Sequence, residues 1–100
     1  MSDWSNLIGF EWDAGNERKS VDKHEVSQAE AEQVFFNEPL LTVSDNKHSG
    51  LEIRIHALGQ TDSGRLLHVT FTLRNQETKI RIISARDMRR KERAYYDDEI

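Results

Sequence analysis

Apolar and polar side chains alternate most regularly in the second half of the chain. Every second residue from Leu67 to Leu73 is large and apolar, and the residues between them are polar. After a polar turn at residues 75–78, the segment 79–85 is rich in β-branched residues and mostly alternates again. A period of two is typical of a strand with one buried face. The pattern predicts two antiparallel strands joined by a turn.

The register of this hairpin follows from the need to keep both apolar faces on the same side of the sheet. A register with Arg74 opposite Lys79 meets this condition. The remaining pairs are then Leu73–Ile80 and Phe71–Ile82 on the core side, and Thr72–Arg81 on the other side. The hairpin is therefore expected to place Arg74, Lys79 and Arg81 on one exposed surface.

Further strands and helices are expected before the hairpin. A short strand at residues 8–12 precedes a surface helix at residues 14–24, and a second helix begins at a capping box of Ser27 and Glu30. Strands follow at residues 40–43 and 51–57. In the latter, the side chains predicted to face inward are Leu51, Ile53, Ile55 and Ala57, and those predicted to face outward are Glu52, Arg54 and His56.

The last element is expected to be an arginine-rich helix. Ser84 and Asp87 have the spacing of a capping box, which predicts that this helix begins near Ala85. Its inward stripe would be Ala85, Met88, Glu92 and Tyr95, and its outward stripe Arg86, Arg89, Arg90 and Arg93. Residues 97–100 are expected to fray. The fold class is α+β: a single domain, residues 1–100, with a small antiparallel sheet packed by two N-terminal helices and one C-terminal helix.

Charge is distributed unevenly along the chain. The formal net charge is −4, yet residues 51–96 hold ten Lys and Arg against five Asp and Glu. Such asymmetry is compatible with a polyanion site on one face or with an internally neutralised domain. The chain has no cysteine, and no segment is typical of a signal peptide or a membrane span. We therefore expect a cytoplasmic protein.

Several motifs, in a fixed order over nearly the whole chain, resemble those of the BrnT family of bacterial toxins. The most specific are the FEWD segment at residues 10–13, the pair Lys23-His24, and the IRIISAR segment at residues 80–86. The other matching positions are Val26, Ala31, Arg54, Leu58-Gly59, Gly64 to Leu67, Arg74, Glu92-Arg93 and Tyr96.

The resemblance implies a RelE-like fold and a toxin of a type II toxin-antitoxin system that cleaves RNA. It also implies neutralisation by a BrnA-like antitoxin with a ribbon-helix-helix domain, through which alone the toxin would reach operator DNA. Three positions depart from the family pattern: Asn16 replaces a lysine, Ser20 an asparagine, and Glu25 a glycine. Asn16 and Glu25 both reduce positive potential near Lys23 and His24, which predicts weakened or lost activity.

Metal-free RNA cleavage needs a deprotonated 2′-hydroxyl, neutralised phosphoryl oxygens and a protonated leaving oxygen. Guanidinium groups suit the second task because they bind phosphate bidentately and stay charged. The candidate catalytic arginines are Arg54, Arg74, Arg81 and Arg86. Any one of them taken alone is more commonly an exposed cation that keeps the protein soluble, and it is the group on one face, together with the resemblance, that favours a functional role.

His24 is the candidate acid or base, because it matches the family and histidine titrates near neutrality. It could instead stabilise a helix C-terminus. The further candidate RNA-binding residues are Lys23, Arg65, Lys79, Arg89, Arg90, Arg93 and Tyr96. His56 and His68 are interpreted as structural, and Tyr95 is expected to pack on the sheet. The spacing of the four histidines is not that of a zinc site, so no metal or cofactor is expected.

Two functions follow from these observations. The first is a metal-independent endoribonuclease toxin. The alternative is a non-catalytic homologue that binds an antitoxin and acts as a co-repressor module. Direct DNA binding is a weaker interpretation, because no helix-turn-helix pattern is present.

Overall fold

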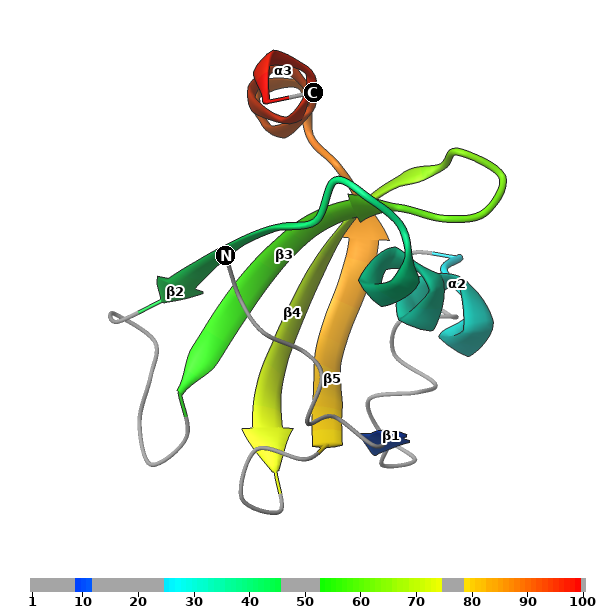
Figure 1. Ribbon diagram of the computed structural model, residues 1–100, viewed down its shortest axis with the longest axis vertical. Coiled ribbons are helices and arrows are strands. Elements are labelled where there is room, and N and C mark those ends of the chain that lie inside the picture. The colour runs from blue at the N-terminus through cyan, green and yellow to red at the C-terminus, as the bar shows by residue number, and fades with distance from the viewer. Residues whose placement is uncertain (1–8, 12–24, 46–52, 75–78, 100) are drawn as a thin grey trace.

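A computed structural model describes residues 9–11, 25–45, 53–74 and 79–99. Within these ranges the fold is α+β, with one five-stranded sheet and two α-helices (Figure 1). The strands are β1 (Gly9–Glu11), β2 (Leu41–Asp45), β3 (Arg54–Gln60), β4 (Leu66–Arg74) and β5 (Lys79–Asp87). The helices are α2 (Gln28–Gln33), the short 3₁₀ turn η1 (Val34–Phe36) and α3 (Arg90–Asp98). The expected helix at residues 14–24 lies outside the described residues.

The sheet is mixed, with strand order β1-β5-β4-β3-β2. Strands β2 to β5 are antiparallel, but β1 pairs with β5 in parallel, with Phe10 level with Ile80. The expectation of a wholly antiparallel sheet is therefore wrong. The pairing brings Phe10 onto the core side, where its ring lies 5.6 Å from that of Phe35. Burial of this ring stabilises the short edge strand against the longer β5.

The predicted register of the β4–β5 hairpin is confirmed. Arg74 is level with Lys79, Phe71 with Ile82, and Thr72 with Arg81. Alternation alone was sufficient here, because a slip of one residue would have turned every apolar side chain of one strand toward solvent.

A β-bulge interrupts the same hairpin. Phe71 pairs with Ile82 but Thr70 pairs with Ser84, so Ile83 is an extra residue in β5. The extra residue restores the alternation in the second half of β5. Ala85 consequently lies beside Val69 in the core, and Arg86 emerges on the opposite face of the sheet.

The last helix begins at Arg90, not near Ala85, so that prediction is wrong. Ser84 and Asp87 are strand residues paired with Thr70 and Leu67. Their capping-box spacing was misleading, because ladder hydrogen bonds to β4 satisfy the backbone there. Residues 97 and 98 belong to α3, and the expected fraying of residues 97–100 stays a prediction.

Helix α2 begins as predicted. The Ser27 hydroxyl accepts a hydrogen bond from the Glu30 amide, and the Glu30 carboxylate accepts one from the Ser27 amide, both at 3.1 Å. This capping box satisfies two amides at the helix N-terminus. The helix tightens into η1, which ends three residues before Pro39.

The core lies between one face of the sheet and the α2–η1 segment (Figure 1). Its buried members are Val26, Ala31, Val34, Ala57, Leu67, Val69, Phe71, Ile80, Ile82 and Ala85. Ile53 was expected to face inward but is 63% exposed, because β3 begins only at the next residue. None of the described helices combines the length and apolar character that a membrane crossing requires.

Candidate functional site

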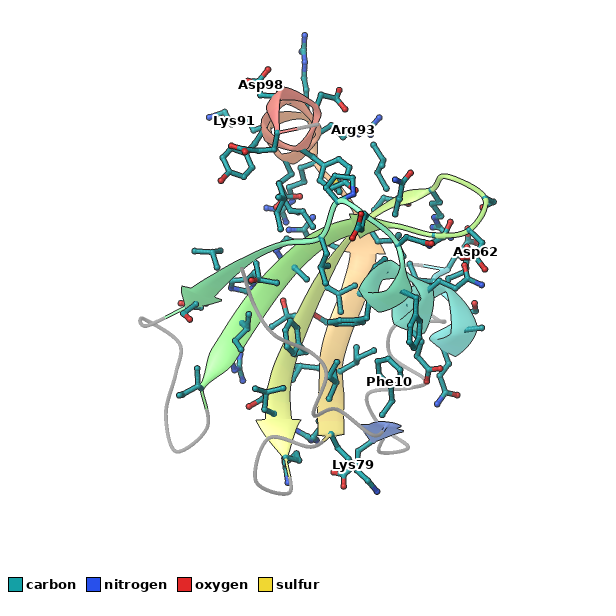
Figure 2. The ribbon with its side chains drawn as sticks, in the orientation of Figure 1. Phe10, Asp62, Lys79, Lys91, Arg93 and Asp98 are labelled. Atoms are coloured by element: carbon teal, nitrogen blue, oxygen red, sulfur yellow. The ribbon has the colours of Figure 1, made fainter. Side chains whose placement is uncertain are left out.

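The face of the sheet opposite the core carries most of the candidate residues, and we call it the polar face. Strand register arranges its side chains in rows across the sheet. The rows are Arg74 and Lys79; then Asp45, Arg54, Thr72, Arg81 and Glu11; then Val43, His56, Thr70 and Ser84; then Leu41, Leu58, His68 and Arg86. Figure 2 shows Lys79 at one end of the sheet, with Lys91 and Arg93 on α3 at the other end. The polar face therefore runs from the hairpin turn to α3.

The arginine end of the polar face consists of its first two rows. Arg54, Arg74 and Arg81 come from three neighbouring strands and share this face, as the alternation predicted. Asp45 is level with Arg54, and Glu11 with Arg81. All three arginines take part in interactions within the protein. The arginine end is therefore positively charged, and the two carboxylates offset part of that charge.

His56 lies next to the arginine end and is held by two hydrogen bonds. Its Nε2 is 2.8 Å from Asp45 Oδ2, and its Nδ1 is 2.9 Å from Thr70 Oγ1. Both ring nitrogens thus have a partner. The imidazole is fixed in one orientation, which makes it a rigid part of the polar face.

His68 packs against His56, with the ring centroids 4.9 Å apart. Its side chain is only 13% exposed, and its Nε2 is 3.9 Å from Glu92 Oε2. Burial, reinforced by the positive charge of Arg86, lowers the pKa of His68 to about 4. His68 is therefore neutral at pH 7.

Arg86 and Glu92 form a bidentate ion pair at the α3 end. The Arg86 Nη1 and Nη2 atoms donate to the two Glu92 oxygens at 2.8 and 2.9 Å, and the Arg89 amide donates to Oε1 at 2.7 Å. Hydrogen bonds from Arg86 lower the pKa of Glu92 to about 2. Arg86 was predicted to be catalytic, but its charge is matched by this carboxylate.

A pocket of about 400 Å³ lies between the polar face and α3. Its lining residues are Leu41, Thr42, Val43, His56, Leu58, His68, Lys91, Glu92 and Tyr95. We call it the α3 pocket. Most of its accessible wall is apolar, and the two histidines and Glu92 supply polar groups.

The two tyrosines of α3 exchange the roles that the sequence predicted for them. Tyr95 is 57% exposed and lines the α3 pocket, whereas Tyr96 is fully buried. The Tyr96 hydroxyl donates to the Pro39 carbonyl, and burial raises the pKa of Tyr96. The helix begins five residues later than expected, so the side chains that face the sheet are not the predicted ones. Tyr96 was a candidate RNA contact, but its position makes it a structural residue.

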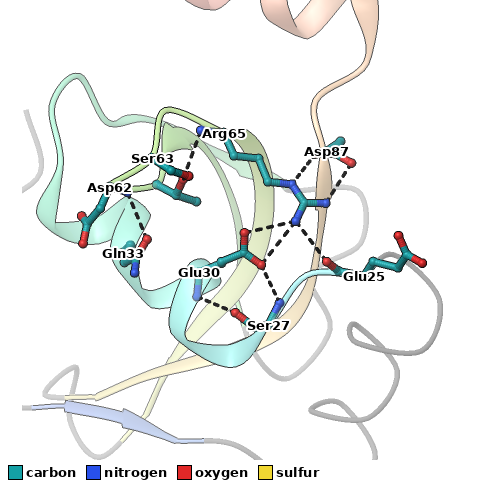
Figure 3. A network of polar contacts seen from close by, with 9 residues as sticks. Glu25, Ser27, Glu30, Gln33, Asp62, Ser63, Arg65 and Asp87 are labelled. Atoms are coloured by element: carbon teal, nitrogen blue, oxygen red, sulfur yellow. Dashed lines mark hydrogen bonds and ion pairs between the residues drawn. The ribbon is translucent and has the colours of Figure 1, made fainter.

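Arg65 was also predicted to bind RNA, but its guanidinium is engaged within the protein (Figure 3). It donates to both Asp87 oxygens at 2.7 and 3.0 Å, to Glu30 at 3.2 and 3.3 Å, and to the Glu25 carbonyl at 3.0 Å. The hydrogen bonds to Asp87 raise the pKa of Arg65. Arg65 thus joins the start of β4, the end of β5 and the N-terminus of α2.

The remaining candidates lie on α3 or outside the described residues. Arg89, Arg90 and Arg93 are exposed around the start of α3, beyond the ends of the strands. Lys23 and His24 are not among the described residues. Within residues 9–11, 25–45, 53–74 and 79–99, no three His, Asp or Glu side chains gather as a metal site would require.

Sequence reasoning missed the cluster of His56, His68 and Glu92. The alternation had placed both histidines on the polar face, and the pairing of Ala57 with Val69 would have made them diagonal neighbours. Glu92 could not be added, because its position depends on where α3 begins.

Comparisons with known proteins agree with this geometry. A family model described as "Ribonuclease toxin, BrnT, of type II toxin-antitoxin system" matches residues 12–92. The fold is similar to the 1.1 Å crystal structure of the Brucella abortus ribonuclease toxin BrnT, with a TM-score of 0.63 and 17% identity over 84% of this chain and 100% of that chain. A search of curated proteins finds no match. Since the family model spans most of the sequence, this chain belongs to the BrnT family of ribonuclease toxins of type II toxin-antitoxin systems.

Proposed function

We propose that this toxin is a metal-independent endoribonuclease that binds the RNA backbone on the arginine end of the polar face. Family membership gives it an RNA substrate and an antitoxin partner. The observation that supports the proposal is the convergence of Arg54, Arg74 and Arg81, from three strands, on one face. A rigid sheet holds these groups at fixed spacing, so little reorganisation is needed when charge develops on the phosphoryl oxygens.

The reaction needs no group beyond side chains and the RNA itself. The 2′-oxygen attacks the adjacent phosphorus and its proton passes to a base, while the bond to the 5′-oxygen breaks and that oxygen takes a proton from an acid. Arg54 and Arg81 would neutralise the non-bridging oxygens in the transition state. His24 remains the proposed acid or base by its match to the family.

The partner we propose is a BrnA-like antitoxin with a ribbon-helix-helix domain, which would connect the toxin to operator DNA in the cytoplasm. A helix at residues 14–24 would complete the RelE-like arrangement that the resemblance implies. Both proposals rest on the resemblance in the sequence.

The alternative proposal is an antitoxin-binding module without catalysis. Two observations favour it: carboxylates lie level with Arg54 and Arg81, and Glu92 matches the charge of Arg86. This alternative predicts tight co-purification with an antitoxin, and no growth arrest when the chain is expressed alone.

Cleavage of RNA in EDTA distinguishes the two proposals. Wild type is expected to cleave, and Arg81→Ala to cleave roughly 100-fold more slowly, the usual effect of removing one group that stabilises developing charge. Arg81→Lys is the matched variant, since it keeps a positive charge at this position without the bidentate guanidinium, and its rate should lie between those of wild type and Arg81→Ala. Equal rates for wild type and Arg81→Ala, or an inactive wild type, would refute catalysis by this surface.

A further inference from the structure

The α3 pocket adjoins the arginine end but differs from it in chemistry. We propose that this pocket receives one unpaired nucleobase of the RNA, with Tyr95 as the platform on which the base stacks. The inference rests on the proposed function, because it assumes that the RNA backbone lies along the polar face.

The dimensions and walls of the pocket suit a flat aromatic ring. Its volume of about 400 Å³ is within the range of sites for small organic molecules, roughly 300 to 1,000 Å³. Leu41, Val43 and Leu58 provide apolar contact, and Tyr95 presents an aromatic side chain that is more than half exposed. Unpaired bases are commonly recognised by stacking on such aromatic side chains.

The polar groups of the pocket suit the edge of a base better than a phosphate. Neutral His68 can donate and accept hydrogen bonds but offers no positive charge at pH 7. The Glu92 carboxylate already accepts hydrogen bonds from Arg86 and from the Arg89 amide. His56, fixed by Asp45 and Thr70, is a positioning residue that holds the wall in shape. Lys91 also lines the pocket, and with Glu92 it gives the lining one positive and one negative side chain, whereas a phosphate site would need an excess of positive charge.

The α3 pocket is close enough to the arginine end for a single nucleotide to reach both. His56 lies two residues from Arg54 on the same face of β3, a separation of about 6.6 Å along a strand. A base in the α3 pocket would therefore leave its own backbone beside the arginine end. Phosphate and base would be bound by neighbouring rows of one sheet face.

The test is the binding of a fluorescently labelled single-stranded DNA oligonucleotide, which lacks the 2′-hydroxyl and so cannot be cleaved. Tyr95→Ala is expected to weaken binding about 5- to 150-fold, the range for loss of one stacked base. Tyr95→Phe keeps the ring and should bind within about twofold of wild type. Phe36→Ala is the matched control: it removes another exposed aromatic ring, 75% accessible, that does not line the pocket.

A second oligonucleotide with abasic sites in place of its bases separates stacking from charge. With it, wild type and Tyr95→Ala should bind equally. The inference is overturned if Tyr95→Ala binds the ordinary oligonucleotide as tightly as wild type, or if its loss persists on the abasic one. Should wild-type protein neither bind nor cleave, the proposed function fails as well. If wild type cleaves and Arg81→Ala does not, while Tyr95→Ala is unaffected, the pocket assignment alone is wrong.

Discussion

The side chains at the two ends of the polar face lie on the same side of the sheet, but the two ends differ in chemistry. At the arginine end, Arg54 and Arg81 occupy one row of neighbouring strands, each level with a carboxylate. At the α3 end, ionisable side chains are mostly buried: Arg86 and Glu92 form a bidentate ion pair, and His68 lies beside them with its Nε2 3.9 Å from Glu92 Oε2. Helix α3 makes the difference, because it contributes Lys91, Glu92 and Tyr95 to the α3 end.

This contrast shows that arginines with matching sequence positions can have different roles in the structure. Arg65 and Arg86 match family positions, yet each donates two hydrogen bonds to a single carboxylate. Such pairs stabilise the fold and reduce the charge available to RNA. The arginines proposed for phosphate binding are Arg54, Arg74 and Arg81, which strand register places side by side. Arg65 and Arg86 instead join one element of the fold to another.

The largest expected effect on stability comes from breaking the ion pair at the α3 end. Arg86→Met would leave the Glu92 carboxylate partly buried without its bidentate partner, and should lower the free energy of unfolding by about 3 kcal/mol. Arg54→Ala, on the exposed start of β3, should change it by less than about 1 kcal/mol, because interactions of exposed charged groups contribute little. Urea denaturation at pH 7 measures both. Similar losses for the two variants would contradict the contrast between the two ends.

The next effect is a loss of stability in mild acid. His68 has a pKa of about 4 in the folded protein, against an ordinary value of 6.5. Between these values the unfolded chain binds a proton that the folded protein does not, so stability falls as the pH drops from 6.5 to 4. We expect a loss of roughly 2 kcal/mol, followed by a further loss below pH 4.5 as Glu92, with a folded pKa of about 2, resists protonation.

Urea midpoints at pH 7, 5.5 and 4.5 measure this dependence, with His68→Gln as the control. The variant should show a flatter profile between pH 6.5 and 4.5. A wild-type midpoint that does not change over this range, or an equally steep profile in His68→Gln, would show that His68 is not held neutral by its surroundings.

The two ends of the polar face should also differ, by a smaller effect, in how much they contribute to the salt dependence of nucleic-acid binding. For single strands, each phosphate contact contributes about 0.7 to the slope of log affinity against log salt. The double variant Arg54→Ala/Arg81→Ala should therefore reduce the slope by about 1.4, whereas Tyr95→Ala should lower affinity without changing it. Fluorescence anisotropy between about 50 and 200 mM salt measures the slopes. An unchanged slope in the double variant would place the phosphates elsewhere.

The sequence predicted those parts of the fold that depend on neighbours along a strand or within a helix turn. The register of Phe71 with Ile82 followed from alternation, and the cap formed by Ser27 and Glu30 followed from their spacing. In both cases the interacting groups are close in the chain. The parallel pairing of β1 was not predicted, because it joins segments about 70 residues apart.

Errors arose where tertiary pairing overrode a local signal. Ser84 and Asp87 have capping-box spacing, but β4 continues alongside them and the strand persists to Asp87. The resulting shift in helix phase buried Tyr96 and exposed Tyr95. The α3 pocket could not be predicted for the same reason.

The structure shows the backbone conformation at Glu25, one of the three departures from the family pattern. The resemblance places glycine at the position of Glu25, and Glu25 has a φ of 54°, in the left-handed region that favours glycine. Its carbonyl accepts a hydrogen bond from Arg65, which helps to hold this conformation. The sequence indicated only the added negative charge.

The most direct test of where RNA binds is to map backbone amide shifts by NMR while a single-stranded DNA oligonucleotide is added. The largest changes are expected at Arg54, His56 and Arg81 on the polar face and at Tyr95 beside the α3 pocket, with little change in α2. Shifts concentrated around Arg65 and α2, with the polar face unaffected, would contradict the account.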